Sequence, residues 1–159
     1  MLENYIEIDH IAIAVNDLDE AIEYYEGVAG LSFEKKLSVQ GENSGMISAI
    51  MKGNNFSFVL LQSTSEGSQI DEYIKKYGPG VQHVAIRVNK IEQAYDSLKD
   101  NQVDFSTNII ESPGLKQAFT NRDDNSGVMI ELIERNGLSG FASNNVKDLF
   151  SQLENRGTF

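Results

Sequence analysis

Length, composition and charge limit what this chain can be. Its 159 residues fit one domain or two small fused repeats, and 40% of them are hydrophobic. The lack of cysteine excludes a disulfide scaffold, a thiolate metal site and a cysteine nucleophile. A net charge of -11 argues against nucleic-acid and membrane partners. Without an apolar run of membrane-spanning length or an export signal in MLENYIEIDH, we expect a cytoplasmic protein.

An internal repeat organises the sequence. HIAIAVNDLDEA at 10–21 returns 73 residues later as HVAIRVNKIEQA at 83–94, with six of the twelve positions identical. Each copy predicts a strand, a helix and then three strands. We therefore expect a single α+β domain in four parts: module 1 at about 7–62, a connector at 63–80, module 2 at about 81–135 and a tail at 136–159.

Module 1 is predicted from its apolar periodicity and its capping residues. Alternating apolar residues indicate a strand over 8–15, and Asn16 or Asp17 can cap a helix over 18–29 that Gly30 ends. Three strands are then expected near 31–40, 45–52 and 56–62. In the connector, QIDEYIKKY favours a short helix that GPG at 78–80 interrupts.

Module 2 repeats this order. A strand over 82–88 and a helix over 90–101 come first. Three strands are expected after them, near 103–109, 115–120 and 127–134. In the tail, NNVKDLFSQLEN predicts a C-terminal helix at about 144–155, which we expect to cover the site as a lid.

The chain has two histidines, and they occupy the same position in the two repeats. If the modules pair about a pseudo-twofold axis, His10 and His83 can converge on one point. The alternative is that each is simply a packed strand side chain. Their repeat-equivalent placement favours a shared site.

A third ligand is expected from the last strand of module 2. Glu131 lies within VMIELIE and shares a face with Met129 and Ile133, so its carboxylate is expected to be buried and to need a cation or another partner. The alternative is an exposed glutamate on an edge strand. Glu134 and Glu111 are expected to be solvated. Two imidazoles and one carboxylate suit Fe(II) in oxygenases, although zinc hydrolases can use the same ligands.

The repeat together with His, His and Glu resembles the vicinal oxygen chelate superfamily, which includes glyoxalase I and methylmalonyl-CoA epimerase. The resemblance implies two paired βαβββ modules that form an open, cupped barrel around a metal. Residues 69–150 are similar to the C-terminal catalytic half of the 4-hydroxyphenylpyruvate dioxygenases. The segments that carry this likeness are SQIDEYI (68–74), GPGVQHVAI (78–86), GLKQAFT (114–120), MIELIER (129–135) and GFASNNVKDLF (140–150).

The resemblance implies roles for individual residues. His10, His83 and Glu131 would bind Fe(II), with Mn, Co or Zn as alternatives. Gln82 and Gln117 would act in catalysis. The substrate would be bound by Ser48, Gln69, Phe119 and Phe141.

Three functions remain open from the sequence. The preferred one is an Fe(II)-dependent dioxygenase that oxidatively decarboxylates an α-keto acid, with dioxygen as co-substrate and a homodimer as a candidate assembly. The second is a divalent-metal isomerase or lyase of the glyoxalase or epimerase type. Those enzymes generally take a fourth ligand from the last strand of the first module, where the repeat places Val59, which cannot bind metal. The third is a non-catalytic small-molecule binding protein.

Overall fold

The computed structural model describes residues 5–40 and 44–137. They divide into two compact units: an N-terminal unit of residues 10–82 and a C-terminal unit of residues 5–9 and 83–137. The unit boundary falls inside the first strand, β1 (Tyr5–Ala14), so the residues that begin this strand belong with the second half of the chain.

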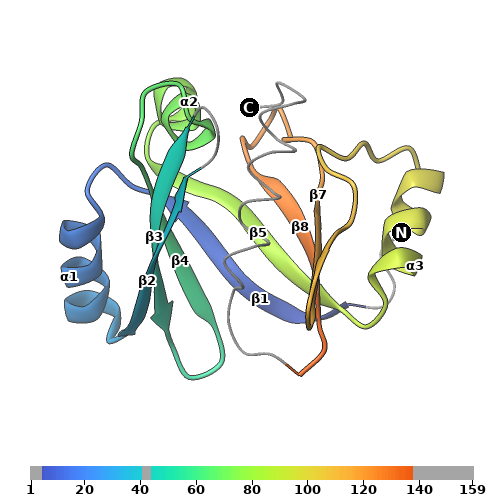
Figure 1. Cartoon of the computed structure of the whole chain (residues 1–159), viewed down its shortest axis with the longest axis horizontal. Helices are drawn as coiled ribbons and strands as arrows, with labels where there is room; N and C mark the ends of the chain where they lie inside the picture. The colour runs from blue at the N-terminus through green and yellow to red at the C-terminus, as the bar shows by residue number, and fades with distance from the viewer. Residues whose placement is uncertain (1–4, 41–43, 138–159) are drawn as a thin grey trace. The chain divides into compact units, whose positions relative to one another are not determined.

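The N-terminal unit contains module 1 and the connector helix. Its strands have the order β2-β3-β4-β1, in which β4 and β1 are parallel and the other neighbours are antiparallel (Figure 1). After β1 come α1 (Leu18–Ala29), β2 (Ser32–Gln40), β3 (Gly45–Lys52), β4 (Ser57–Ser63) and α2 (Gln69–Tyr77).

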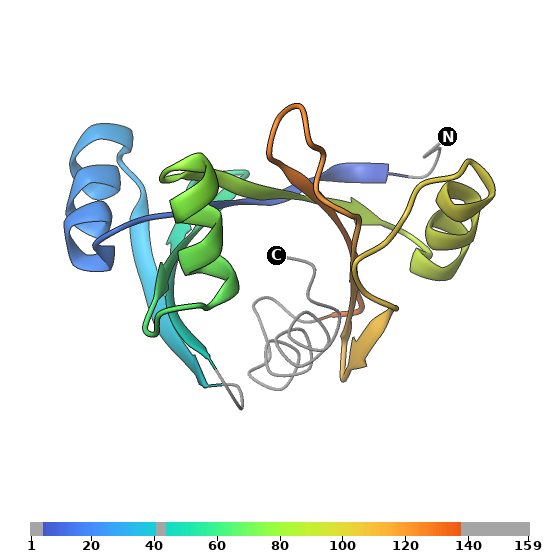
Figure 2. The same cartoon turned by 90° about the horizontal axis from the view of Figure 1, so that it is seen from above.

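Helix α1 begins and ends at residues suited to those positions. The Asp17 carboxylate accepts a hydrogen bond from the Glu20 backbone N–H at 2.9 Å, and Gly30 has a φ of 62°, which a residue with a Cβ rarely adopts. The helix packs on one face of β2, β3 and β4 (Figure 2). Beneath it lies an apolar cluster of Leu18, Leu31, Ala49, Met51 and Leu60.

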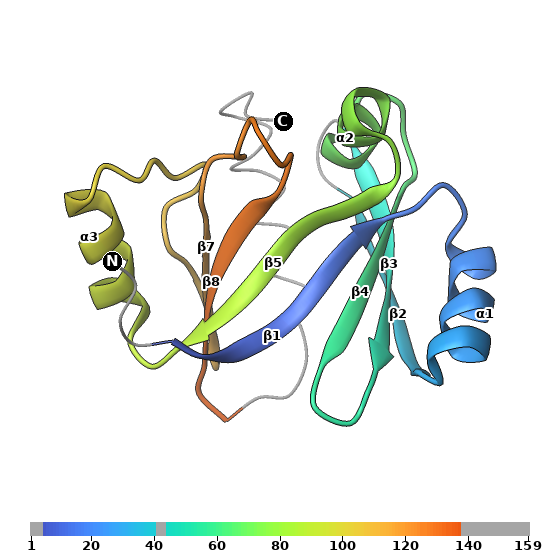
Figure 3. The same cartoon turned by 180° about the vertical axis from the view of Figure 1, so that it is seen from behind.

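The C-terminal unit repeats this plan. Its strands have the order β5-β8-β7-β6, with β5 and β8 parallel and the other neighbours antiparallel (Figure 3). The elements are β5 (Gly80–Val88), α3 (Ile91–Asp100), β6 (Ile110–Ser112), β7 (Leu115–Phe119) and β8 (Met129–Arg135). The apolar cluster associated with α3 consists of Val88, Ile91, Ala94, Ala118 and Leu132.

The expectation that Glu134 is solvated is wrong. Its side chain is buried, and its Oε2 accepts a hydrogen bond from the Ile91 backbone N–H at 2.7 Å. Helix α3 begins after Lys90, which makes no side-chain capping bond, so a glutamate from β8 satisfies a donor that a local residue would ordinarily satisfy. Glu111 is exposed, as expected.

The strand predicted over 103–109 is also wrong. This segment forms a single bridge, between Phe105 and Thr120, and the regular strand β6 starts only at Ile110. The Ser106 hydroxyl donates to the Thr120 carbonyl, and the Thr107 hydroxyl accepts from the Phe119 N–H. These side-chain hydrogen bonds to the backbone of the neighbouring strand take the place of the regular backbone–backbone hydrogen bonds of a sheet.

The structure confirms the α+β fold with two βαβββ modules and a connector helix. The predicted C-terminal helix at 144–155 lies outside the described residues. Within the described part of the chain, no helix has the length and apolar character needed to cross a membrane.

Candidate metal centre

The C-terminal unit holds two of the three predicted ligands on neighbouring strands. In the parallel pairing of β5 with β8, His83 is opposite Met129, and Ala85 is opposite Glu131. Leu132 packs in the cluster beneath α3. Because side chains alternate along a strand, Glu131 lies on the face of β8 that points away from this helix, as the sequence predicts.

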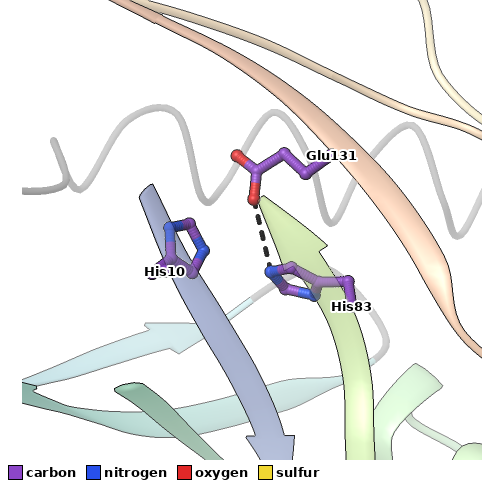
Figure 4. A group of neighbouring side chains, drawn as sticks. All are labelled: His10, His83 and Glu131. Carbon is purple, nitrogen blue, oxygen red and sulfur yellow. Dashed lines mark ion pairs between the residues drawn. The ribbon is translucent and has the colours of Figure 1, made fainter. Parts of the chain in front are cut away.

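His83 and Glu131 approach each other closely and are both buried. The His83 Nε2 lies 3.3 Å from the Glu131 Oε2, and the two side chains are 10% and 1% exposed (Figure 4). Neighbouring ligands on a metal with bonds of about 2.1 Å are about 3.0 Å apart at 90° and about 3.4 Å apart at a tetrahedral angle. The pair therefore fits two adjacent positions on one metal ion.

Strand β7 adds a predicted substrate residue, Phe119, and a predicted catalytic residue, Gln117, to the same face. Phe119 is opposite Glu131 in the β7–β8 pairing, and its ring meets the His83 ring edge-on, with centroids 5.3 Å apart. Gln117 is opposite Ile133 and is also buried. An imidazole, a carboxylate, an amide and an aromatic ring thus share one face of this unit.

The backbone around Phe119 is fixed by residues that the sequence analysis missed. The Ser106 N–H donates to the Phe119 carbonyl at 2.9 Å, and the Phe119 N–H donates to the Thr107 hydroxyl at 2.9 Å. Both Ser106 and Thr107 are buried. The signal in the sequence that could have indicated this is the adjacent pair of small hydroxyl residues, which lies within a segment whose other residues favour a strand.

His10 lies in the N-terminal unit and is 2% exposed. Ile13 and Val15 of this unit pack on the cluster beneath α1, whereas His10 lies on the other face of the strand together with the buried Ala12 and Ala14. Each repeat therefore places its histidine on the face of the first strand that is turned away from the module's helix.

Two more predicted substrate residues, Ser48 and Gln69, and the predicted catalytic residue Gln82 are buried too. Ser48 lies on β3, on the opposite face from Ala49 and Met51 of the α1 cluster. Gln69 is the first residue of α2 and Gln82 lies on β5. Their roles stay predictions, and Phe141 lies outside the described residues.

The strand register confirms that Val59 and Glu131 are equivalent. Val59 is opposite Ala12 in the parallel pairing of β1 with β4, as Glu131 is opposite Ala85 in module 2. Val59 is buried and offers no donor atom. Its neighbour Gln62 accepts a hydrogen bond from the Leu18 N–H at 2.7 Å, so this amide caps α1.

A partly buried ion pair lies in the same unit as His83 and Glu131. Arg135 donates to both carboxylate oxygens of Asp9, from Nε at 2.6 Å and from a terminal nitrogen at 2.8 Å. Burial lowers the pKa of the Arg135 guanidinium, but the hydrogen bond and charge of Asp9, together with the charge of Glu131, outweigh burial and raise it. Arg135 therefore stays charged.

Comparison with known proteins gives both a family and relatives. A model described as "Glyoxalase/Bleomycin resistance protein/Dioxygenase superfamily" matches residues 9–119. A 4-hydroxyphenylpyruvate dioxygenase from Pseudomonas aeruginosa is 27% identical over 92% of this chain and 51% of its own length. The chain thus spans about half the length of this curated relative.

Solved structures share the fold. A triple mutant of 4-hydroxymandelate synthase from Streptomyces coelicolor superposes with a TM-score of 0.87 at 23% identity, covering 97% of this chain and 55% of that one. Methylmalonyl-CoA epimerase from Mycobacterium tuberculosis gives a TM-score of 0.72 at 27% identity, covering 86% of this chain and 92% of that one. The fold expected from the sequence is thereby confirmed.

Proposed function

Because the chain belongs to the glyoxalase/bleomycin resistance protein/dioxygenase superfamily, we propose that it is an Fe(II)-dependent dioxygenase that oxidatively decarboxylates an α-keto acid. The metal ligands in this proposal are His10, His83 and Glu131. The observation that carries it is the buried approach of the His83 Nε2 to the Glu131 Oε2 at 3.3 Å. Two histidines and one carboxylate are the donor set of non-haem Fe(II) oxygenases.

His10 is proposed as the third ligand for two reasons. It is the repeat equivalent of His83 and, like His83, it is buried on the strand face turned away from its module's helix. In addition, its chain neighbour Asp9 is bound to Arg135, which belongs to the same strand as Glu131. His10 is therefore one peptide bond from a residue that is paired with this strand.

The remaining residues of the site would bind and enclose the substrate. When bound, Fe(II) supplies the reactivity toward dioxygen that a protein side chain lacks. Gln117 can donate its amide N–H groups to the keto-acid carboxylate, and Phe119, packed against His83, helps to exclude water from the reacting centre. Manganese, cobalt and zinc suit the same three ligands and are the alternative metals.

Val59 is the observation that favours this reaction over that of an isomerase. Three protein ligands leave three positions of an octahedral metal open, enough for a bidentate keto acid and dioxygen. A glyoxalase-type or epimerase-type enzyme is the second candidate, favoured by the likeness to methylmalonyl-CoA epimerase. The absence of a donor at Val59 counts against it, and the buried ligand set counts against a non-catalytic binding protein.

Metal analysis combined with oxygen consumption tests the proposal. Protein purified anaerobically should bind one Fe(II) per chain and should consume oxygen with at least one member of a panel of aryl and alkyl α-keto acids, releasing carbon dioxide in equal amount. Glu131→Ala should abolish both metal binding and oxygen uptake. Turnover of an acyl-CoA or a hemithioacetal under argon, without oxygen uptake on any keto acid, would establish the isomerase instead.

A further inference from the structure

A bidentate ion pair joins β1 to β8. Asp9 and Arg135 are 126 positions apart in sequence, and their side chains are only 9% and 13% exposed. Asp9 is peptide-bonded to His10, and Arg135 follows Glu131 by four residues in β8. One partner of the pair is therefore the chain neighbour of a proposed metal ligand, and the other lies on the same strand as a second.

An ion pair that is mostly removed from water contributes more to fixing the geometry of its two strands than to the stability of the fold. Removing two charges from water offsets much of their attraction, so that well-packed apolar residues of similar volume are often at least as stabilising. Two parallel N–H···O bonds, in contrast, fix the direction as well as the distance between the strands. The pair is thus better suited to set a geometry than to add stability.

On the basis of the proposed metal site, we propose that Asp9 and Arg135 are positioning residues that hold the Asp9 end of β1 at a fixed distance and direction from β8, so that His10 reaches the metal bound by His83 and Glu131. Metal–ligand bonds tolerate deviations of only about 0.2 Å. A shift of the Asp9 backbone passes directly to His10 through the peptide bond. Loss of the pair should therefore weaken metal binding even where the domain stays folded.

The same strand provides a matched control. Glu7, two residues before Asp9, pairs with Arg87 of β5 at 2.8 Å. The Glu7 and Arg87 side chains are 49% and 37% exposed, so this pair contributes little in solution. Breaking it removes an ion pair between β1 and another strand of the same unit while leaving the buried pair intact.

The test is a titration with Co(II), followed by calorimetry and by visible absorption, which reports the ligand geometry. Asp9→Asn, which keeps the shape of the side chain, should weaken Co(II) binding by about 10-fold or more, the range found when residues that orient metal ligands are changed. Glu7→Gln should stay within about 2-fold of the wild type, as expected for an exposed pair. Arg135→Lys keeps the positive charge but loses the two parallel donors of the guanidinium. Its Co(II) affinity should lie between that of Asp9→Asn and that of the wild type.

A double variant separates positioning from stability. Asp9→Leu combined with Arg135→Met replaces the ion pair with apolar side chains. These side chains can pack in the same space, but they do not fix the direction between β1 and β8. Its melting temperature should equal or exceed that of the wild type, while its Co(II) affinity stays low and its absorption spectrum is altered at saturating metal. If the double variant and Asp9→Asn bind Co(II) with wild-type affinity and spectrum, the positioning role is wrong although the metal site stands. If the wild type itself does not bind one Co(II) per chain, the metal site and the positioning role both fail.

Discussion

Val59 in module 1 and Glu131 in module 2 occupy the same place in two copies of one strand pairing. Each lies opposite an alanine of the neighbouring parallel strand, Ala12 in one case and Ala85 in the other. Both are buried, yet one is apolar and the other carries a carboxylate. The strand register has been kept while the chemistry at one position has diverged, so the repeat is symmetric in fold and asymmetric in its proposed ligands.

At other equivalent positions, the residues of the two modules have more similar roles. Gln62 accepts from the first N–H of α1, and Glu134 accepts from the first N–H of α3, each at 2.7 Å. Leu60 and Leu132 are fully buried in the two clusters associated with these helices. The residues that hold helix to sheet are therefore similar in both modules, and the difference lies on the opposite face of the strands.

The largest expected effect comes from removing the side chains at the position that differs. Glu131→Ala should lower metal affinity by more than about 100-fold, beyond what loss of an outer residue costs, because a ligand itself is removed. Val59→Ala should leave metal affinity unchanged and should lower the free energy of unfolding by about 2 kcal/mol, the cost of removing buried methyl groups. Calorimetric titration and denaturant unfolding measure these two quantities. Equal loss of metal from both variants would show that the two positions do not differ in function.

Giving module 1 the residue type of module 2 should change the reaction while keeping the metal. Val59→Glu supplies a fourth donor, which fills one of three open positions and leaves too few for a bidentate keto acid and dioxygen together. Metal affinity should be kept or should rise, and keto-acid-dependent oxygen uptake should be lost. Val59→Leu is the apolar control and should keep oxygen uptake. Wild-type oxygen uptake by Val59→Glu would mean that residue 59 does not reach the metal.

The two cores should respond alike to truncation. Leu60→Ala and Leu132→Ala each leave a cavity in a cluster packed against a helix, and each should lower the free energy of unfolding by about 2–5 kcal/mol. Denaturant unfolding followed by circular dichroism gives both values. Two separate transitions in either variant, where the wild type shows one, would indicate that the units unfold independently.

The smallest effects are expected from the helix-capping side chains. Gln62→Ala should destabilise by about 1 kcal/mol, as loss of a neutral helix cap typically does. Glu134→Ala should cost about 2 kcal/mol, because a charged acceptor makes the stronger hydrogen bond. Thermal unfolding measures both, and Glu134→Gln should recover most of the loss because it keeps an acceptor. A larger effect from Gln62→Ala than from Glu134→Ala would contradict this order.

Local signals in the sequence predict most of the fold. The apolar alternation, the Asp17 cap and Gly30 predict the strand–helix start of module 1, and the repeat transfers the same order to module 2. The repeat also misleads at 103–109, because it carries no information about the hydroxyls of Ser106 and Thr107, which bond to the backbone near Phe119 and Thr120.

In the candidate site, too, some features follow from local sequence patterns and others do not. The equivalent positions of His10 and His83 are predictable from the repeat, and the burial of Glu131 is predictable from alternation. The interactions between residues that are far apart in the sequence are not predictable in this way. Glu134 reaches Ile91 across 43 residues and Asp9 reaches Arg135 across 126, and neither pairing leaves a pattern in the sequence near either partner.

The Asp9–Arg135 contact also has a consequence for the order of folding. A contact between residues so far apart closes a loop of nearly the whole chain, and such contacts form late because loop closure costs more entropy as the loop lengthens. During synthesis, residues 10–82 are complete well before β8 emerges. The ion pair of Asp9 can form only after Arg135 has been synthesised. The N-terminal unit can therefore fold before the Asp9–Arg135 pair forms, although Asp9 precedes every residue of that unit in the sequence.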